Sequence, residues 1–482
     1  MNNVFIVLLV QVLLGGFDNL WHHEITEKLP SKPSALHELA MHSVRELIYG
    51  VIFVGLAWFE WHGYFAYMLA GLLFVELIVT LIDFIIEDKT RKLPAFERVL
   101  HTLLAINIGI FFAVLFPRVS GWAAQASEMV YVTYGLWSWC YSLFGLGVFI
   151  WGIRDAIAVM KLRILKIPLW QRKPVSHSVK ENPKTYLITG GTGFIGTALV
   201  RALIMRGDKI IVLTRDLAKA KYQFGPQVRV IEALDEISDY EKIDTIINLA
   251  GEALAGGLWT KTRKKSFFDS RINITRSIFR LGERLIQKPQ LLINASAIGY
   301  YGNRGDKELQ ENSAPETDFM SDLCQKWEVE ARKLEQLGIN VVRLRIGLVL
   351  GRTGGIFVPF ALSAQLFGAM ILGSGEQWMS WISLNDLIRM ILFIDDQKVQ
   401  STVINATAPK AVRQSEFIKK LASSLHRPVL FRAPGFILRF ILRDMADLFL
   451  NGQKVLPNKA EKLGFNFAHE NIDEAFKSIL ES

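Results

Sequence analysis

Cysteine is scarce, because the 482 residues include only Cys140 and Cys324. Two cysteines cannot build a disulfide framework, and the chain has no Cys-x-x-Cys pair that would indicate a metal site. Cys140 lies in an apolar run, whereas Cys324 lies in a part of ordinary globular composition. The globular part therefore has the cysteine content typical of a reducing compartment.

Runs of lysine and arginine interleaved with aromatic residues are also missing, although the net charge is +9. This absence argues against a nucleic-acid partner. The densest basic stretch, residues 154–173, carries six basic residues against the single acid Asp155. Because it follows an apolar segment, we expect it to lie at a lipid bilayer. We interpret residues 154–183 as a basic juxtamembrane segment and linker.

Hydrophobic residues make up 51% of the chain and are concentrated in residues 1–153. A membrane-spanning helix needs ~20 mostly apolar residues. The hydrophobic runs predict a transmembrane helical block with five spans, of which the first two are short: 1–17, 47–59, 64–86, 100–116 and 130–153. A cleaved signal peptide is the alternative for residues 1–17, but they lack a positive n-region and a clear A-x-A site.

Lysine and arginine are distributed unevenly between the connections of these spans. The connections after the first, third and fifth spans are basic, whereas the opposite side has only Arg118. The positive-inside rule then places the N-terminus outside and everything after Ile153 in the cytoplasm. We expect a multi-pass protein of the inner (plasma) membrane.

The stretch "TYLITGGTGFIG" (185–196) is typical of a dinucleotide-binding loop. Gly190, Gly193 and Gly196 follow a short apolar strand and precede a helical pattern. In such a motif the glycines allow a sharp turn, close approach to a pyrophosphate and tight helix packing. The next strand ends in Thr214 and Arg215 rather than in an acid, and a guanidinium suits a 2′-phosphate. We therefore expect NADP(H) rather than NAD(H), unless Arg215 is a solvated loop residue.

Strand and helix signals alternate after residue 184, which predicts an α/β Rossmann-type parallel sheet covered on both faces. The expected domain spans 184–425 and includes the substrate-side loops, and a small C-terminal domain follows at 426–482. The candidate strands are 185–189, 209–214, 228–231, 243–249, 289–296, 339–346 and 402–406.

Motifs in this region occur in a fixed order: "GGTGFIG", "INLAGE", "NASAIGYYG", "RLRIGLVLG" and "SWISLNDL". Over 184–480 the chain resembles the extended short-chain dehydrogenase/reductase superfamily, and more closely its atypical epimerase-family group. The resemblance implies that Ser296 approaches the nicotinamide of the cofactor. It also implies further cofactor contacts, to the pyrophosphate from Gly190, Gly193, Phe194, Ile195 and Gly196, and to the rest of the dinucleotide from Leu249, Ala250 and Gly251.

Active members of that superfamily carry Tyr-x-x-x-Lys, and this chain departs from the pattern. Its corresponding region places Met320 and Cys324 at the two positions, and neither can transfer the proton. Tyr300 or Tyr301, near Ser296, could replace the missing acid. Alternatively, both tyrosines pack beneath their loop.

Tryptophan, arginine and glutamine side chains are candidates for a substrate site that takes a small anionic or ring-bearing molecule. Alternatively, the tryptophans close the core of the smaller domain. The candidates are Trp259, Arg263, Arg271, Gln377, Trp378 and Trp381.

Three functions remain open at this stage. The chain could be an NADP-dependent oxidoreductase or epimerase-like enzyme with a non-standard active site. It could be a non-catalytic NADP(H) sensor coupled to the membrane block. It could also pass electrons from NADPH to a metal or haem in the membrane.

Six of the nine histidines lie in the first 101 residues, with acids at helical spacing. Glu38 and His42 share a helix face, and so do Glu97 and His101. Such groups hold metals in helical bundles, and paired histidines hold haem. A proton path and simple placement at the membrane interface are the alternatives.

Overall fold

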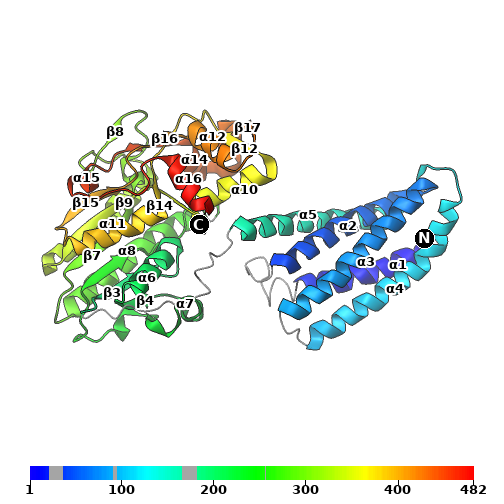
Figure 1. Ribbon diagram of the computed structural model, residues 1–482, viewed down its shortest axis with the longest axis horizontal. Helices are drawn as coiled ribbons and strands as arrows, with labels where there is room; N and C mark the ends of the chain where they lie inside the picture. The colour runs from blue at the N-terminus through cyan, green and yellow to red at the C-terminus, as the bar shows by residue number, and fades with distance from the viewer. Residues whose placement is uncertain (21–35, 91–94, 165–181, 256, 482) are drawn as a thin grey trace. The chain divides into compact units, whose positions relative to one another are not determined.

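The computed structural model describes residues 1–20, 36–90, 95–164, 182–255 and 257–481 (Figure 1). The chain divides into two compact units, Met1–Ile167 and Pro168–Ser482. Each unit has its own hydrophobic core. We call them the helical unit and the dinucleotide unit and describe each by itself.

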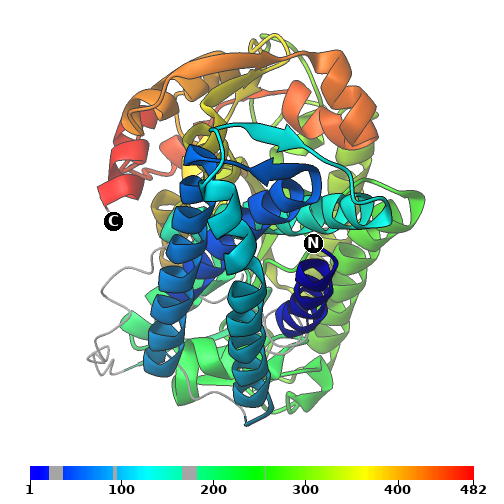
Figure 2. The same ribbon diagram turned by 90° about the vertical axis from the view of Figure 1, so that its right-hand side faces the viewer.

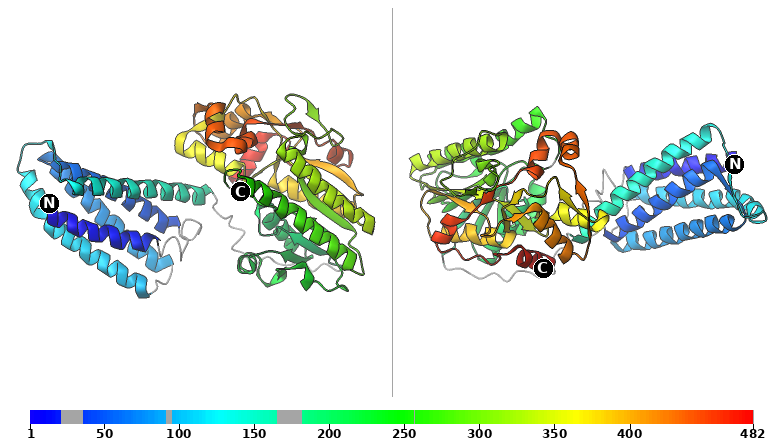
Figure 3. Two further views of the ribbon diagram at one scale, coloured as in Figure 1. Left: turned by 180° about the vertical axis from the view of Figure 1, so that it is seen from behind. Right: turned by 90° about the horizontal axis from the view of Figure 1, so that it is seen from above.

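The helical unit is a bundle in which helices from distant parts of the sequence lie alongside one another (Figures 2 and 3). Helix α2 packs along α5, and α1 packs along α4. Two short strands, β1 (Phe59–Trp61) after α2 and β2 (Met129–Tyr131) before α5, pair antiparallel with each other. The described helices are α1 (Asn2–Asp18), α2 (Leu36–Trp58), α3 (Tyr64–Thr90), α4 (Ala95–Ala123) and α5 (Leu136–Ile164).

Four of these helices contain stretches long and apolar enough to cross a membrane: Leu36–Trp58, Tyr64–Ile86, Arg98–Ala123 and Leu136–Met160. Helix α1 is apolar but shorter. Two expected spans need correction. The second begins at residue 36 instead of 47, because the bundle buries Glu38 and Glu46 inside a helix that a hydropathy scan ends early. The fifth begins at residue 136 instead of 130, because residues 129–131 form β2.

The dinucleotide unit is built on a seven-stranded parallel sheet in the order β15-β9-β7-β6-β3-β4-β5. All seven predicted strands are confirmed: three have the predicted bounds, and the other four differ by one or two residues at an end. The strands are β3 (Thr185–Thr189), β4 (Lys209–Leu213), β5 (Val228–Ile231), β6 (Thr245–Asn248), β7 (Leu291–Ala297), β9 (Asn340–Ile346) and β15 (Thr402–Ala406).

Helices cover both faces of this sheet, as its apolar strands require. Successive side chains of a strand point to opposite faces. Tyr186 and Ile188 of β3 pack on one face with α6 (Phe194–Met205) and α11 (Leu384–Asp396). Leu187 packs on the other face with α8 (Lys261–Arg284) and the end of α9 (Phe319–Arg332). Because the seven strands are parallel, their carboxyl ends meet at one edge of the sheet, where ligands bind in open α/β sheets.

The C-terminal part of the chain packs against earlier segments of the same unit. Strand β17 (Val429–Ala433) pairs with β12 (Ala369–Leu372), and β18 (Lys454–Val455) pairs with β8 (Glu308–Leu309). Helix α12 (Gln414–Ser424) contacts α16 (Ile472–Glu481). The segment 426–482 is thus joined to the chain before it by strand pairing and helix packing.

Candidate functional site

The glycine loop leaves β3 at Gly190 and enters α6 at Gly193. Gly190 has φ +68°, and a Cβ on it would lie 2.6 Å from the carbonyl oxygen of Leu249. A Cβ on Gly196 would lie 2.2 Å from the carbonyl oxygen of Gly190, so only glycine lets α6 pack against the loop. Gly193 is the N-cap of α6 and has no side chain to accept from the first helical N–H groups. The structure therefore presents free N–H donors and a positive helix end to a phosphate, which fits a dinucleotide.

Phe194 and Ile195 begin α6, but their side chains face protein. The Phe194 ring packs against the hairpin of β10 (Leu348–Gly351) and β11 (Gly354–Gly355), where a Cβ on Gly354 would come within 2.6 Å of the ring. Ile195 packs against the hydrophobic core. Only their backbone N–H groups are placed to meet a pyrophosphate.

The end of β4 carries the residues expected to meet the adenosine ribose. The Thr214 N–H donates to Ile231 O at 3.0 Å, and its hydroxyl accepts from the Asp216 N–H at 3.2 Å. Asp216 is the N-cap of α7 (Leu217–Phe224) and accepts from the Lys219 N–H at 2.9 Å. Arg215 between them is exposed, and its side chain forms no hydrogen bond or ion pair within the described ranges. Its expected role toward a 2′-phosphate stays a prediction.

The segment after β6 borders the same edge. The Ala250 N–H donates to the Thr189 hydroxyl at 3.2 Å, which ties this segment to β3. The guanidinium of Arg271 lies 2.8 Å from where a Cβ on Gly251 would stand, and it donates to Glu252 O at 3.0 Å. Leu249 and Ala250 thus lie beside Gly190 of the glycine loop, and Gly251 lies against Arg271; their contacts to a cofactor stay a prediction.

A pocket of about 300 Å³ opens at the carboxyl ends of β7 and β9. It is lined by Ala297, Ile298 and Gly299 after β7, by Gly347 and Leu348 after β9, and by segments around residues 377–379 and 447–453. Three of the six candidate substrate residues, Trp259, Gln377 and Trp378, line it. We call it the substrate-side pocket.

The other three candidates, Arg263, Arg271 and Trp381, are not among the residues that line this pocket. The Arg263 guanidinium donates to Ala253 O at 2.9 Å and lies 3.2 Å from the Glu252 carboxylate. Trp381 is fully buried and donates to Lys410 O at 2.9 Å, so it closes the core. Trp378 therefore lies at the pocket, whereas Trp381 lies in the core.

Two glutamines at this pocket hold amide atoms without a partner. Gln377 donates to Leu372 O at 3.0 Å and to Phe449 O at 2.8 Å, which leaves its Oε1 buried and unpaired. Gln414 accepts from the Leu372 N–H at 3.2 Å, which leaves its Nε2 buried and unpaired. Both atoms are buried and have no partner among the described residues, and a water molecule or a ligand with the complementary groups would satisfy them. Sequence reasoning missed Gln414, which lies at the start of a helix with no motif around it.

Met320, where the superfamily has its tyrosine, lines the substrate-side pocket against Gly299. Cys324, one turn further along α9, is buried, and burial raises the pKa of its thiol to about 12. Among the lining residues that the structure describes, Asp318 and Asp447 are the titratable ones, and Tyr, Lys, His and Cys are missing. The lining thus contains no tyrosine–lysine pair.

The predicted catalytic residues lie behind this pocket, and this corrects their expected placement. Ser296 is 3% exposed and donates to Glu328 at 2.8 Å. Tyr301 is fully buried, donates to Asn405 at 2.7 Å and accepts from Arg345 at 2.9 Å.

Electrostatics also disfavour Tyr301 as a proton donor. Burial raises its pKa to about 12, against the opposing effect of Arg345. The ring of Tyr300 lies beneath the Arg345 guanidinium, 3.3 Å from its central carbon to the ring centroid. Neither tyrosine is among the residues that line the pocket: Tyr301 is fully buried, and the half-buried Tyr300 packs against Arg345, which pairs with Glu328.

The expected metal ligands of the helical unit are separated. His42 Nε2 lies 3.3 Å from Asp83, whereas His101 Nε2 lies 3.0 Å from Asp18. Glu38 is buried on α2, and the side chain of Glu97 is outside the described residues. Within the described ranges no group of three or more His, Cys, Asp or Glu side chains could hold a metal ion. His42 and His101 each lie near a different carboxylate, and among the described residues the expected ligand set is not found.

Comparisons with known proteins match the dinucleotide unit. Residues 186–406 match the NAD dependent epimerase/dehydratase family, and residues 433–479 match a domain of unknown function (DUF1731). An epimerase family protein of Staphylococcus haemolyticus is 37% identical over 302 residues, which cover 62% of this chain and 100% of the relative. A chloroplastic homolog of epimerase family protein SDR39U1 from Arabidopsis thaliana is 35% identical over 310 residues, covering 63% and 89%.

Solved structures agree with these matches. The human epimerase family protein SDR39U1, whose structure was determined with NADPH, has a TM-score of 0.56 and 29% identity. That comparison covers 62% of this chain and 99% of the human one. A nucleoside-diphosphate sugar epimerase of Corynebacterium glutamicum has a TM-score of 0.51 and 27% identity, covering 69% of this chain and 64% of that one.

Proposed function

Because the chain belongs to the NAD-dependent epimerase/dehydratase family, we propose that it is an NADP(H)-dependent oxidoreductase or epimerase-like enzyme, anchored to a membrane by its helical unit. Its substrate is a small, uncharged polar molecule. The reaction proceeds without a Tyr-x-x-x-Lys pair.

The observation that carries this proposal is the pair of unpartnered amides at the substrate-side pocket. Gln377 Oε1 and Gln414 Nε2 are a neutral acceptor and a neutral donor, which match a hydroxyl and a carbonyl oxygen of a substrate. The pocket opens at the carboxyl ends of β7 and β9, the same sheet edge as the glycine loop. When bound at that loop, the nicotinamide would supply hydride transfer.

The chain's own side chains bind and orient the substrate more than they move its protons. Asp318 caps α9 by accepting from the Ser321 N–H at 2.8 Å, and Asp447 accepts from Arg439 at 3.0 Å. Each carboxylate already accepts a hydrogen bond, and we propose that the exchanged proton passes to water. We therefore expect a slow turnover compared with members that carry the tyrosine–lysine pair.

NADP(H) is the form of the cofactor that we propose. Arg215 is exposed at the end of β4, where an acid would otherwise select NAD(H). The human relative that shares 29% of its sequence was solved with NADPH, which supports this choice.

The test uses the purified full-length protein and follows NADPH oxidation with small neutral aldehydes, ketones and sugars. We expect Gln377→Leu and Gln414→Leu each to raise KM about tenfold, the effect of one lost hydrogen bond of ~1.4 kcal/mol, with NADPH affinity unchanged. Gln325→Leu is the matched control, because Gln325 bonds only within its own segment, to Glu316 O and Ser321. Unchanged KM in both pocket variants would contradict the assigned pocket.

A second candidate function is an NADP(H)-binding regulatory module without turnover. The burial of Ser296 and Tyr301 favours it, because the usual catalytic positions serve the fold. Tight NADPH binding with no oxidation of NADPH by any member of the panel would favour this module over the enzyme. Electron transfer to a metal or haem in the helical unit gains no support, since no group of three or more possible metal ligands is found among the described residues.

The membrane arrangement is also a proposal. Four long apolar helices and the basic segment at 154–173 support anchoring. With α1 as a fifth span, the lysine and arginine distribution places the N-terminus outside and the dinucleotide unit in the cytoplasm, at the inner (plasma) membrane.

A further inference from the structure

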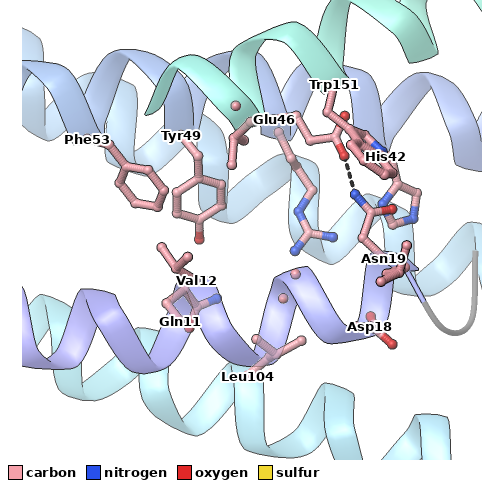
Figure 4. Close-up of a pocket in the computed structure, with 16 residues that line it drawn as sticks. Gln11, Val12, Asp18, Asn19, His42, Glu46, Tyr49, Phe53, Leu104 and Trp151 are labelled. Carbon is pink, nitrogen blue, oxygen red and sulfur yellow. Dashed lines mark hydrogen bonds between the residues drawn. The ribbon is translucent and has the colours of Figure 1, made fainter. Parts of the chain in front are cut away.

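The helical unit contains a cavity of about 320 Å³ between α1, α2, α4 and α5 (Figure 4). Its lining includes buried atoms of both kinds without a partner in the described chain, acceptors such as Glu46 Oε2 and donors such as Arg45 Nε. Buried water satisfies acceptors and donors alike. The lining therefore selects no particular ligand, in contrast to an exposed surface of the dinucleotide unit.

This surface lies where β17 continues through Pro434 into α13 (Gly435–Leu442). All eight residues of α13 are described, and none of them is buried. Phe436 and Phe440 are 74% and 85% exposed. Exposed apolar patches with a polar rim mark sites of protein or membrane interaction. The exposed apolar side chains, which we call the α13 surface, are Leu430 and Phe431 of β17 and Phe436, Ile437, Phe440 and Ile441 of α13.

The apolar side chains form a continuous stripe along α13. Residues four apart are neighbours on a helix, so Phe436 stands beside Phe440 and Ile437 beside Ile441. Leu438 and Leu442, on the opposite side, are half-buried. Among the five exposed residues of α13, Arg439 is the only one with a polar side chain. The helix therefore turns a wide apolar face to its surroundings.

Arginines border the α13 surface and give it a positive rim. Arg439 pairs with Asp447 at 3.0 Å, and the neighbouring exposed acid Asp444 pairs with Lys264 at 2.6 Å. The other three arginines form no ion pair with any residue that the structure describes. The rim thus carries positive charge that the protein does not neutralise. The four exposed arginines are Arg427, Arg432, Arg439 and Arg443.

An anionic lipid bilayer fits this combination. Phenylalanine and isoleucine side chains enter the boundary of the acyl chains, and guanidinium groups stay at the lipid phosphates. A second copy of the chain fits less well, because a two-fold axis through the surface would bring two clusters of unpaired arginines together. We propose that the α13 surface docks on the anionic face of the membrane that anchors the chain. This docking rests on the membrane anchoring proposed above.

Docking of the α13 surface also concerns the substrate-side pocket. Helix α14 (Asp447–Leu450) follows α13 after the four residues 443–446. Asp447, Leu448 and Phe449 line the pocket, and the ion pair of Arg439 with Asp447 connects α13 to this wall. A docked α13 surface therefore places one wall of the pocket next to the lipid headgroups.

Quenching by spin-labelled lipids tests the docking in the full-length protein, in nanodiscs of phosphatidylcholine and phosphatidylglycerol. A fluorophore is attached through Phe440→Cys or, as the matched control, through Tyr240→Cys, because Tyr240 is 83% exposed and precedes β6. Both variants also carry Cys140→Ala, since Cys140 is exposed whereas Cys324 is buried. We expect the lipids to quench the label strongly at 440 and weakly at 240. Equal quenching at the two positions would overturn the proposal.

A label on the native Cys140 separates docking from anchoring. Cys140 is exposed on α5, one of the helices long and apolar enough to cross a membrane, so we expect the lipids to quench it. Quenching at Cys140 without quenching at 440 would overturn the docking alone. An unquenched label at Cys140 would instead overturn the anchoring on which the docking rests.

Charge reversal tests the role of the arginine rim. We expect Arg432→Glu with Arg443→Glu to reduce quenching at 440 by about fivefold, because both charges then repel anionic lipid. Lys265→Glu with Arg280→Glu is the control of equal net charge, since both residues are exposed on α8 and form no ion pair among the described residues. The same quenching in both double variants would contradict docking on anionic lipid. Label emission at 440 that changes with protein concentration in lipid-free detergent would assign the surface to a second copy and overturn the proposal.

Discussion

The buried ion pair between Glu328 and Arg345 gives the sharpest prediction for the dinucleotide unit. The side chains are 6% and 3% exposed, and two parallel bonds join them: Nε to Oε1 at 2.8 Å and NH2 to Oε2 at 2.9 Å. Glu328 also accepts from Ser296, and Arg345 donates to Tyr301. Replacing Glu328 by glutamine leaves a buried guanidinium without its counter-ion.

Removing one partner of a buried ion pair costs about 3–5 kcal/mol, because the remaining charge stays desolvated. We therefore expect Glu328→Gln to lower the free energy of unfolding by that amount. The double variant Glu328→Met, Arg345→Met removes both charges and should recover most of the loss. Part of the loss remains, since Tyr301 loses a donor, at a cost of about 1–3 kcal/mol.

Urea unfolding of residues 183–482, followed by tryptophan fluorescence, measures these differences. This segment contains both regions that match known domain families, 186–406 and 433–479. Lys326→Met is the control on the same helix, because Lys326 and Asp322 are 59% and 46% exposed and such pairs contribute below about 1 kcal/mol. A loss below 1 kcal/mol in Glu328→Gln, or a double variant less stable than the single one, would refute the reasoning.

Three further predictions concern the cofactor, pH and topology. Arg215→Glu should weaken NADPH at least tenfold more than NADH in dinucleotide titrations, and an equal loss for both would remove Arg215 from the 2′-phosphate role. Burial raises the pKa of Asp395, but hydrogen bonds from Lys184 and two hydroxyls outweigh it and hold this pKa below its ordinary value. The stability it contributes is present above the unfolded pKa of ~3.9 and is lost as pH falls through the folded pKa. Asp395→Asn should therefore make the urea midpoint of unfolding fall less steeply as the pH is lowered, and an unchanged pH dependence at acid pH would contradict this. A reporter active only in the cytoplasm should be active after Ser482 and silent after Ser120, whereas activity at both would contradict the span count.

The parallel sheet could be predicted from the sequence because its strands are buried on both faces. Such strands are short continuous apolar runs between glycine-rich or polar turns, as in residues 185–189 and 243–249. The glycine loop is equally local, since Gly190 and Gly196 are required by the turn and by the helix that follows directly. Both features depend on neighbours within about thirty residues of the chain.

The interior placement of Ser296 and Tyr301 could not be predicted in this way. It depends on Glu328 and Arg345, which come from α9 and β9 and meet only in the folded sheet. The start of α2 at residue 36 has a similar cause, because Glu38 and Glu46 are buried by contacts with other helices. Hydropathy counts a buried acid as a break in a span, whereas the bundle accommodates it.

The ion pair and the substrate-side pocket together favour binding without strong acid–base chemistry. α9 carries Met320 on its pocket side and Glu328 two turns further into the core, so one helix removes the usual proton donor and buries the serine beside it. Ser296 and Tyr301, the candidates for proton transfer, are instead packed in the core, beside the ion pair of Glu328 with Arg345. What remains at the sheet edge is a phosphate-binding loop and a pocket with neutral amide groups. Under the proposed function, such a site would discriminate substrates by hydrogen bonding and shape, and its rate would depend on proton exchange with water.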